Sequence, residues 1–167
     1  MRWPPTSRRR VVIRLQTGNT MKSNLYHRIP SWVSSGSSFH IRIRTDPSNH
    51  PVLTNPILAQ FLLDSARFYH HPQRWFLHLI VLMPDHLHGI ISFSTSPGMS
   101  KIIAFWKAYA ARTLGVRWQR NYFDHRLRDE AEFAEKSSCI RMNPVRAGLC
   151  KNPDGWPWML DSKRLTD

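Results

Sequence analysis

Apolar and polar side chains alternate strictly in residues 39–44, where the sequence is FHIRIR. Successive side chains of a strand point to opposite faces, so this pattern predicts a strand with one buried and one basic face. His40, Arg42 and Arg44 share the basic face. A strand of this kind belongs at the boundary between a hydrophobic core and a polar surface.

Two further apolar runs, residues 75–82 and 89–93, are joined by a turn that contains Met, Pro and Asp. They predict a β-hairpin, because Pro and Asp supply typical turn chemistry. His86 and His88 take alternate positions where the second strand begins, so both imidazoles project from one face. Two adjacent imidazoles on a strand are able to hold one divalent metal ion. The same spacing also occurs in surface pairs and in hydrogen-bonded structural pairs.

Three segments have helical spacing and follow turn signals made of Pro, Gly, Asp or Asn. They cover residues 57–69, 100–114 and 130–142. In the third segment, Asp129 is the expected N-cap, and Asn143 followed by Pro is the expected stop. The apolar stripe predicted for the first helix consists of Ile57, Phe61, Ala66 and Phe68.

The order of these elements predicts an α+β fold. Part of residues 118–128 supplies a fourth strand, which gives the order βαββαβα. This is the ferredoxin-like arrangement, an antiparallel four-stranded sheet with its helices on one face. We expect the other face to be free for a ligand and to carry both histidines of the hairpin.

The chain has 167 residues, a length that suits one domain. We expect a basic, irregular N-terminal arm over residues 1–37, a folded domain over 38–150, and a tail over 151–167 that packs on or near the domain. Met1 and Met21 are both candidate starts. The pattern does not distinguish a monomer from a homodimer.

The charge balance points to a partner. Lys and Arg number 24 against 11 Asp and Glu, a formal charge of +13. Such a balance favours nucleic acid as the first candidate and an anionic membrane surface as the second. Because the guanidinium fork suits phosphate, the excess of Arg strengthens the first. The candidate DNA-contacting residues are Arg42, Arg44, Lys107, Arg120, Arg126 and Arg128.

Cysteine content and apolar run length narrow the class of protein. The two cysteines, Cys139 and Cys150, are too few for a disulfide scaffold or a multi-thiolate zinc finger. This usage predicts a cytoplasmic protein. No apolar run approaches the roughly 20 residues that span a bilayer, so we expect no membrane partner.

Four blocks of sequence, in order and at consistent spacing, resemble the REP-associated tyrosine transposases, a branch of the HUH single-tyrosine transposases. They are YHRIPSWV followed by FHIRIR (26–33 and 39–44), MPDHLH (83–88), WQRNYFDHRLR (118–128) and IRMNPVRAGL (140–149). The resemblance implies a protein of DNA transposition and recombination, which binds single-stranded DNA hairpins formed by palindromes and nicks them. It also implies that His86 and His88 hold Mg²⁺ or Mn²⁺, with Asn143 as a third, oxygen-donating ligand.

The sequence departs from this family at the nucleophile. The family pattern Tyr-Ile-x-x-Asn-Pro begins here with Cys139. A thiol sulfur lies closer to the backbone than a phenolic oxygen, so we expect cleavage by metal-assisted transesterification to be lost or weakened. If Cys139 turned toward the metal, two imidazoles and a thiolate would favour Zn²⁺.

Two other interpretations remain open. One is an active nickase that uses Cys139 or a displaced tyrosine. The other, from a different class, is a ferredoxin-like RNA-binding module in which the histidine pair is incidental. The second of these lacks the stacking aromatics expected at the outward positions of the central strands.

Overall fold

The structure is a computed structural model and describes residues 36–48, 52–70 and 74–165. The expected N-terminal arm lies almost entirely outside these residues. In chain order, the elements are β1 (Ser38–Arg44), α1 (Pro56–His70), β2 (Phe76–Leu82), β3 (His86–Ser92), α2 (Met99–Leu114), β4 (Phe123–Arg126), α3 (Glu130–Arg141), α4 (Asn143–Arg146) and β5 (Met159–Asp161).

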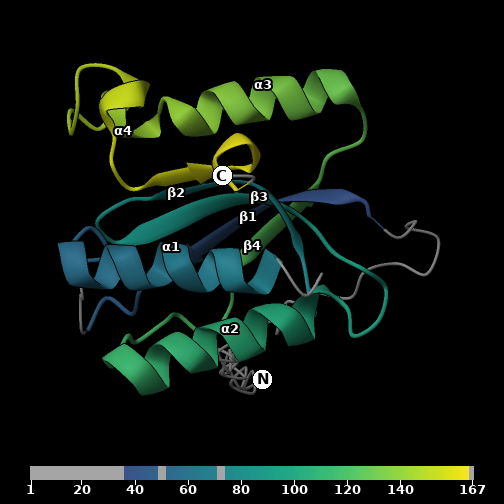
Figure 1. The fold of residues 1–167 in the computed structure, drawn as a ribbon, viewed down its shortest axis with the longest axis horizontal. Helices are drawn as coiled ribbons and strands as arrows, with labels where there is room; N and C mark the ends of the chain where they lie inside the picture. The colour runs from purple at the N-terminus through teal and green to yellow at the C-terminus, as the bar shows by residue number, and fades with distance from the viewer. Residues whose placement is uncertain (1–35, 49–51, 71–73, 166–167) are drawn as a thin grey trace, which may run out of the picture.

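One antiparallel sheet of five strands, in the order β4-β1-β3-β2-β5, forms the centre of the fold (Figure 1). The α+β class and the βαββαβα order expected from the sequence are confirmed. The fifth strand, β5, comes from the segment after residue 150 and pairs with β2 at one edge. The C-terminal segment therefore completes the sheet.

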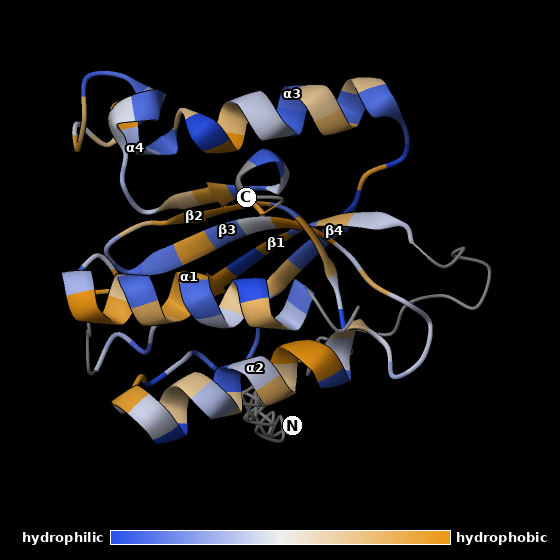
Figure 2. Cartoon of the chain, viewed as in Figure 1, coloured by the Kyte–Doolittle hydropathy of each residue, from blue (hydrophilic) through white to orange (hydrophobic). Residues whose placement is uncertain are grey.

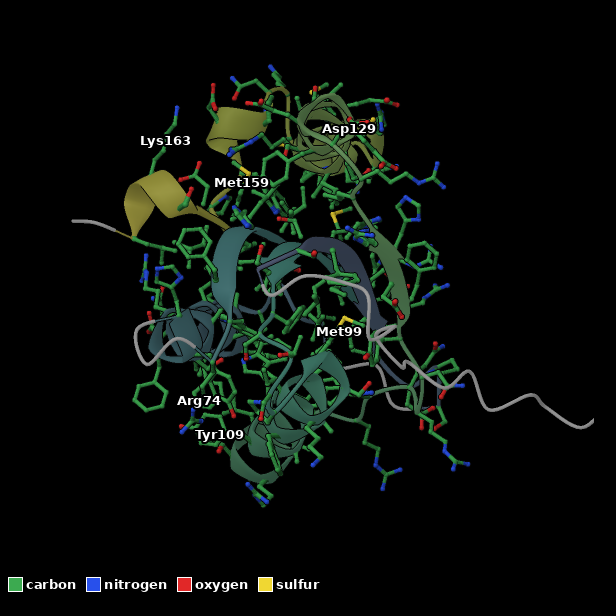
Figure 3. All side chains as sticks on the ribbon, turned by 90° about the vertical axis from the view of Figure 1, so that its right-hand side faces the viewer. Arg74, Met99, Tyr109, Asp129, Met159 and Lys163 are labelled. Carbon is green, nitrogen blue, oxygen red and sulfur yellow. The ribbon has the colours of Figure 1, made fainter. Side chains whose placement is uncertain are left out.

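Helices lie on both faces of the sheet. α1 and α2 cover one face, and α3 and α4 lie over the other (Figure 1). In the view of Figure 3, Met99 of α2 and Asp129 at the start of α3 stand on opposite sides of the sheet. The fold differs here from the expected single helical layer. None of the described helices is both long enough and apolar enough to cross a bilayer.

The larger hydrophobic core lies between the sheet and helices α1 and α2. Ile41 and Ile43 of β1, Leu82 of β2, Leu62 of α1 and Trp106 of α2 are all buried in it. In Figure 2, β2 is hydrophobic along most of its length, as expected for a strand covered on both faces. This core fixes the sheet, and with it the direction of every side chain on the opposite face.

The buried stripe of α1 differs from the predicted one. Ile57 and Phe68 are 77% and 60% exposed, whereas Leu58, Leu62 and Ala66 are buried. An apolar run this dense satisfies helical spacing on more than one face, so periodicity alone does not choose between them. The prediction was wrong for Ile57 and Phe68.

A smaller apolar cluster joins α3 to the opposite face of the sheet. Leu79, Val81 and Ile90 of the central strands pack there with Ile140 of α3 and with Trp156. The cluster lies over β2, β3 and β5. The rest of this face, formed by β1 and β4, carries mostly polar side chains together with Phe123, and we call it the open half of the α3 face.

Candidate metal centre and nucleic-acid interface

His86 and His88 lie on the α3 face of β3. Their rings meet edge to face, with centroids 4.9 Å apart. In the pairing of β1 with β3, His86 stands opposite Arg44 and His88 opposite Arg42. Two imidazoles and two guanidinium groups therefore share one patch of the sheet.

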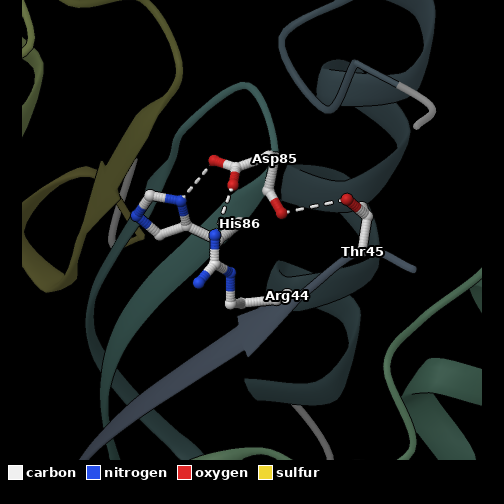
Figure 4. Close-up of polar contacts among 4 residues, drawn as sticks. All are labelled: Arg44, Thr45, Asp85 and His86. Carbon is white, nitrogen blue, oxygen red and sulfur yellow. Dashed lines mark hydrogen bonds and ion pairs between the residues drawn. The ribbon is translucent and has the colours of Figure 1, made fainter. Parts of the chain in front are cut away.

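Asp85 fixes the ring of His86 (Figure 4). The His86 Nδ1–H donates to Oδ1 of Asp85 at 2.6 Å, and Nη2 of Arg44 donates to Oδ2 at 2.8 Å. The hydroxyl of Thr45 donates a hydrogen bond to the backbone carbonyl of Asp85 at 3.0 Å. Burial opposes ionisation of Asp85, but the hydrogen bonds from His86 and Arg44 outweigh it and lower the pKa of the carboxyl to about 2. A carboxylate bound to Nδ1 leaves Nε2 of His86 as the atom able to bind a metal.

His40 orients the ring of His88, as Asp85 orients that of His86. Nε2 of His40 and Nδ1 of His88 share a hydrogen bond of 3.0 Å, and the two rings stack with centroids 5.3 Å apart. Burial, followed by the charge of His86, lowers the pKa of His88 to about 3, so the ring is neutral at physiological pH. When Nδ1 of His88 carries the shared proton, its Nε2 presents a lone pair.

Helix α3 runs toward this patch. Near its start, Phe133 meets His78 edge to face at 5.1 Å, and two turns later Ile140 belongs to the cluster that contains Met83. Arg141, in the last turn of α3, donates to Sδ of Met159 at 3.6 Å, and Met159 pairs with Val81, the partner of His88. The C-terminal end of α3 therefore lies near the part of the sheet that carries His88. The half-buried Cys139 stands at this end of α3.

The proposed donor set suits a divalent ion that accepts both nitrogen and oxygen ligands. His86 and His88 would give two imidazole nitrogens, and Asn143, the first residue of α4, would give an amide oxygen. In the part of the chain that the structure describes, no three His, Cys, Asp or Glu side chains gather as a metal site. Within these residues Cys139 is therefore not grouped with the two histidines, and the zinc set that would include its thiolate stays a prediction.

The buried histidines predict a stability that falls on mild acidification. Burial, followed by the charges of Lys136, His125 and Arg42, lowers the pKa of His40 to about 4. The ordinary pKa of a histidine is 6.5, so below this pH both side chains are protonated in the unfolded chain, whereas His40 and His88 stay neutral in the folded protein. The free energy of unfolding therefore decreases as the pH falls from about 6.5 to 4.

We expect the free energy of unfolding to decrease by about 2 kcal/mol over this pH range, a value reduced to allow for the partial exposure of both side chains. Urea unfolding at several pH values, with chelator present, measures it. A His40→Asn variant, which removes one of the two groups, should show a shallower dependence on pH. An equal dependence in both forms would contradict this assignment.

The open half of the α3 face contains a cavity of about 350 Å³. The guanidinium of Arg42 lies 5.8 Å from the ring centroid of Phe123, and the His40 ring meets the same phenylalanine edge to face at 5.5 Å. Nε2 of His125 contacts the Glu132 carboxylate at 2.7 Å. The side chains that line the cavity are His40, Arg42, Phe123, His125 and Lys136.

The DNA-contacting candidates chosen from the sequence are spread over the molecule. Arg42 and Arg44 lie on the α3 face, and Arg120 and Arg128 are exposed in loops beside β4. Arg126 stands opposite the core residue Phe39, and so projects to the other face.

Lys107 differs from its expected role as a surface cation. It is on α2, where its Nζ donates to the carbonyls of Gln119 and Arg120 at 2.7 and 3.1 Å. Burial lowers the pKa of this ammonium group. It therefore ties α2 to the loop before β4, on the face of the sheet away from the histidine pair.

The described tyrosines lie away from the histidine pair. Tyr69 and Tyr122 pack in or against the larger core, and Tyr109 of α2 stacks on Phe61 of α1 at 5.3 Å. Burial raises the pKa of Tyr122 to about 12. All three belong to the α1 and α2 side of the sheet, opposite the face that carries the histidine pair. Tyr26 is outside the described residues.

Sequence reasoning missed five residues of this site as functional partners. They are His40 as the partner of His88, Asp85 as the partner of His86, and Phe123, His125 and Lys136 in the cavity lining. For Asp85 a signal existed, since a carboxylate stands directly before the His-x-His motif. The other contacts depend on which strands and helices become neighbours.

Comparison with known proteins supplies an independent view of this arrangement. No family model matches the chain. A putative REP-associated tyrosine transposase of Haemophilus influenzae is 27% identical over 97 residues, which cover 47% of this chain and 54% of the relative. An uncharacterised protein of the same organism is 29% identical over 93 residues, which cover 39% of this chain and 52% of the relative. The chain thus spans about half the length of the curated relatives it matches.

A solved structure gives the decisive match for the fold. It is a REP-associated tyrosine transposase bound to a REP hairpin, with a TM-score of 0.67 and 18% identity, over 79% of this chain and 81% of the other. The chain has the fold of a REP-associated tyrosine transposase. The resemblance to that family is confirmed by the curated relative, and the solved structure shows that the fold is shared.

Proposed function

We propose that this protein binds DNA hairpins with single-stranded flanks, and that a DNA phosphate meets a divalent metal ion on the α3 face of its sheet. The observation that carries the proposal is the pair His86 and His88, each with Nδ1 engaged by a neighbour and Nε2 left to bind a metal. The solved REP-associated transposase of the same fold, bound to a REP hairpin, supports the choice of nucleic acid.

The proposed metal is Mg²⁺ or Mn²⁺, held by His86, His88 and Asn143. When bound, such an ion acts as a Lewis acid that polarises a phosphodiester. The protein's own contribution is orientation: Asp85 and His40 fix the two imidazole rings before any ligand arrives. Prepositioned ligands lower the ordering cost of binding both metal and DNA.

Arg42 and Arg44 would hold the DNA strand beside the histidines. Both side chains are exposed on β1, next to His88 and His86 in register. Arg44 is already oriented by Asp85, whereas Arg42 lies beside the ring of Phe123. A guanidinium group binds phosphate oxygens in a bidentate manner, which fixes the strand without reading its sequence.

We propose further that strand cleavage is lost or weakened. Cys139 holds the position of the family tyrosine, at the end of α3 that approaches the histidines, but its sulfur is only one bond beyond Cβ. Attack on phosphorus requires contact distance, and a misplacement of about 1 Å can cost about 100-fold in rate. The location in the cytoplasm and the choice between monomer and homodimer stay predictions.

Two alternatives receive less support from the geometry. A displaced tyrosine would have to come from outside the described residues, because Tyr69, Tyr109 and Tyr122 lie on the other side of the sheet. An RNA-binding module would stack bases on exposed aromatics of a free central sheet. Here α3 covers the half of that face over β2 and β5, and the adjoining strands present His and Arg.

The experiment that tests the proposal compares a labelled hairpin with single-stranded flanks and a duplex of equal length, titrated at moderate salt. We expect tighter binding of the hairpin by about tenfold or more. Charge alone predicts only salt-sensitive binding without discrimination. An Arg42→Ala variant should weaken hairpin binding and reduce the salt slope by about 1, whereas Arg112→Ala on α2 should change neither by as much. Equal affinities for the two DNAs would contradict the proposal.

A further inference from the structure

An ion pair joins the C-terminal end of α3 to the edge strand β5. Nη2 of Arg141 donates to Oδ2 of Asp161 at 2.9 Å, and Asp161 is buried. We propose that this ion pair sets the rotation of α3 about its own axis, and so directs Cys139 and Asn143 toward the histidine pair. Arg141 and Asp161 are then positioning residues. The inference rests on the proposed function, because Asn143 is a metal ligand only in that proposal.

The contacts of α3 show how the helix is rotated. Its sheet-facing side carries Phe133, which meets His78 of β2, and Ile140, which packs in the smaller apolar cluster. Successive residues of an α-helix are turned by about 100°. Arg141 therefore leaves the helix on one flank of Ile140, and Cys139 leaves it on the other. Because Arg141 reaches β5, the opposite flank is directed toward β3, β1 and β4.

Two contacts on that opposite flank support this direction. Glu132 contacts the histidine of β4 at 2.7 Å, and Lys136 lines the cavity beside β1. Cys139 and Asn143 follow Lys136 at the three- and four-residue steps of the same helical row. The row continues past the end of α3, because Met142 keeps right-handed helical backbone angles.

Apolar packing alone determines this rotation weakly. Among the side chains of α3, only Ile140 is buried, and a helix can roll about a single apolar contact. A roll of roughly 10° moves an atom that lies about 6 Å from the helix axis by about 1 Å. Such a displacement exceeds what the coordination geometry of a small divalent ion tolerates. A directional contact at the end of α3 is therefore needed to hold Asn143 in place.

The strand end of the ion pair is fixed relative to the histidines. Asp161 pairs with Leu79 of β2, and Met159 of the same short strand pairs with Val81. Val81 in turn stands opposite His88 of β3. The ion pair thus ties α3 to the strand rows that carry the proposed metal ligands.

The first test is a calorimetric titration of the full chain with Mn²⁺. The double variant Arg141→Met/Asp161→Asn removes both charges together, since a single change would leave one charge buried and unpaired. We expect it to weaken Mn²⁺ binding about tenfold, the scale on which groups that orient metal ligands act. Added to Asn143→Ala, it should cause no further loss, because its effect passes through Asn143.

The second test needs no metal. In a Cys150→Ser background, Cys139 is the only thiol of the chain, and its rate of reaction with a thiol reagent reports its exposure. Cys139 is half-buried, and a helix that rolls exposes its flank. With chelator present and well below the melting temperature, the Arg141→Met/Asp161→Asn change should raise this rate at least about threefold.

The matched control is the ion pair of α1, on the other face of the sheet. Nη1 of Arg67 lies 3.0 Å from Oδ1 of Asp64. The variant Arg67→Met/Asp64→Asn should show the native Mn²⁺ affinity and the native thiol rate. A native affinity or a native thiol rate in Arg141→Met/Asp161→Asn would overturn the inference. A further loss of affinity when that variant is added to Asn143→Ala would also overturn it.

The two tests separate this inference from the proposed function. Absence of Mn²⁺ binding in the native chain, with a faster thiol reaction in the variant of the ion pair, would remove the metal centre and support the control of α3 rotation. Mn²⁺ binding that depends on His86 and His88 but is unaffected by loss of the ion pair would support the metal centre and overturn the inference.

Discussion

A Cys139→Tyr variant is expected to form a covalent adduct with hairpin DNA in the presence of Mn²⁺, where the native chain forms little or none. Position 139 lies on α3 at the end that approaches the histidine pair and is only half-buried, so a larger side chain need not enter the core. A tyrosine there moves the nucleophilic oxygen to the far side of a ring. We expect at least about a 100-fold gain in adduct, because placement dominates such rates.

Denaturing gel electrophoresis of labelled hairpin DNA measures the adduct. Cys139→Phe is the matched control, since it has the same ring without the hydroxyl group and should give no adduct. Strong adduct from the native chain would contradict the proposed loss of cleavage. Absence of adduct from the tyrosine form, on a hairpin that it binds, would show that more than one residue limits the reaction.

The His86→Ala/His88→Ala double variant is expected to lose divalent metal binding. These two imidazoles supply both nitrogen donors of the proposed set, and the amide oxygen of Asn143 alone is too weak a ligand to hold an ion. Calorimetric titration with Mn²⁺ should show at least a 100-fold loss of affinity. His40→Asn should cost about 10- to 100-fold, because His40 orients His88 without being a ligand.

A control for this experiment is His78, which lies on the same face of the sheet but on β2. It hydrogen-bonds the hydroxyls of Ser38 and Ser92 at 3.2 and 2.9 Å. His78→Ala should leave the Mn²⁺ affinity unchanged. Identical heats in the native chain and the double variant would disprove the metal site.

The elements of the fold that could be predicted are those whose sequence pattern is sufficient without contacts to distant parts of the chain. Residues 39–44 alternate so strictly that the strand and its two faces followed from the sequence, and the hairpin was set by Pro84 and Asp85. Asp129 is the predicted N-cap, and its side chain accepts from the backbone N–H of Glu132. Local chemistry determines each of these features.

Other elements depend on neighbours that are distant in sequence. β5 has only three residues, Met159–Asp161, and is a strand because β2 offers it an edge. The face of α3 could not be predicted, since few of its side chains are apolar and only Ile140 is buried. Its apolar contacts depend on the sheet already being in place.

In the candidate site, too, some features follow from local sequence and others depend on contacts between distant segments. That His86 and His88 share a face is a consequence of strand geometry, but the contact of His40 with His88 requires β1 to pair with β3 in one register. The cavity needs β1, β4 and α3 together. Residues that act through such contacts carry no signal in a single sequence.

The most direct measurement of the central claim is the affinity for the flanked hairpin with Mn²⁺ and with chelator, at matched ionic strength. If the metal held by His86 and His88 contacts a DNA phosphate, the two ligands must strengthen each other's binding. We predict that Mn²⁺ tightens hairpin binding by the native chain about tenfold, and that it has no effect on the His86→Ala/His88→Ala variant. An equal effect of Mn²⁺ on both proteins, or no effect on the native chain, would contradict the claim.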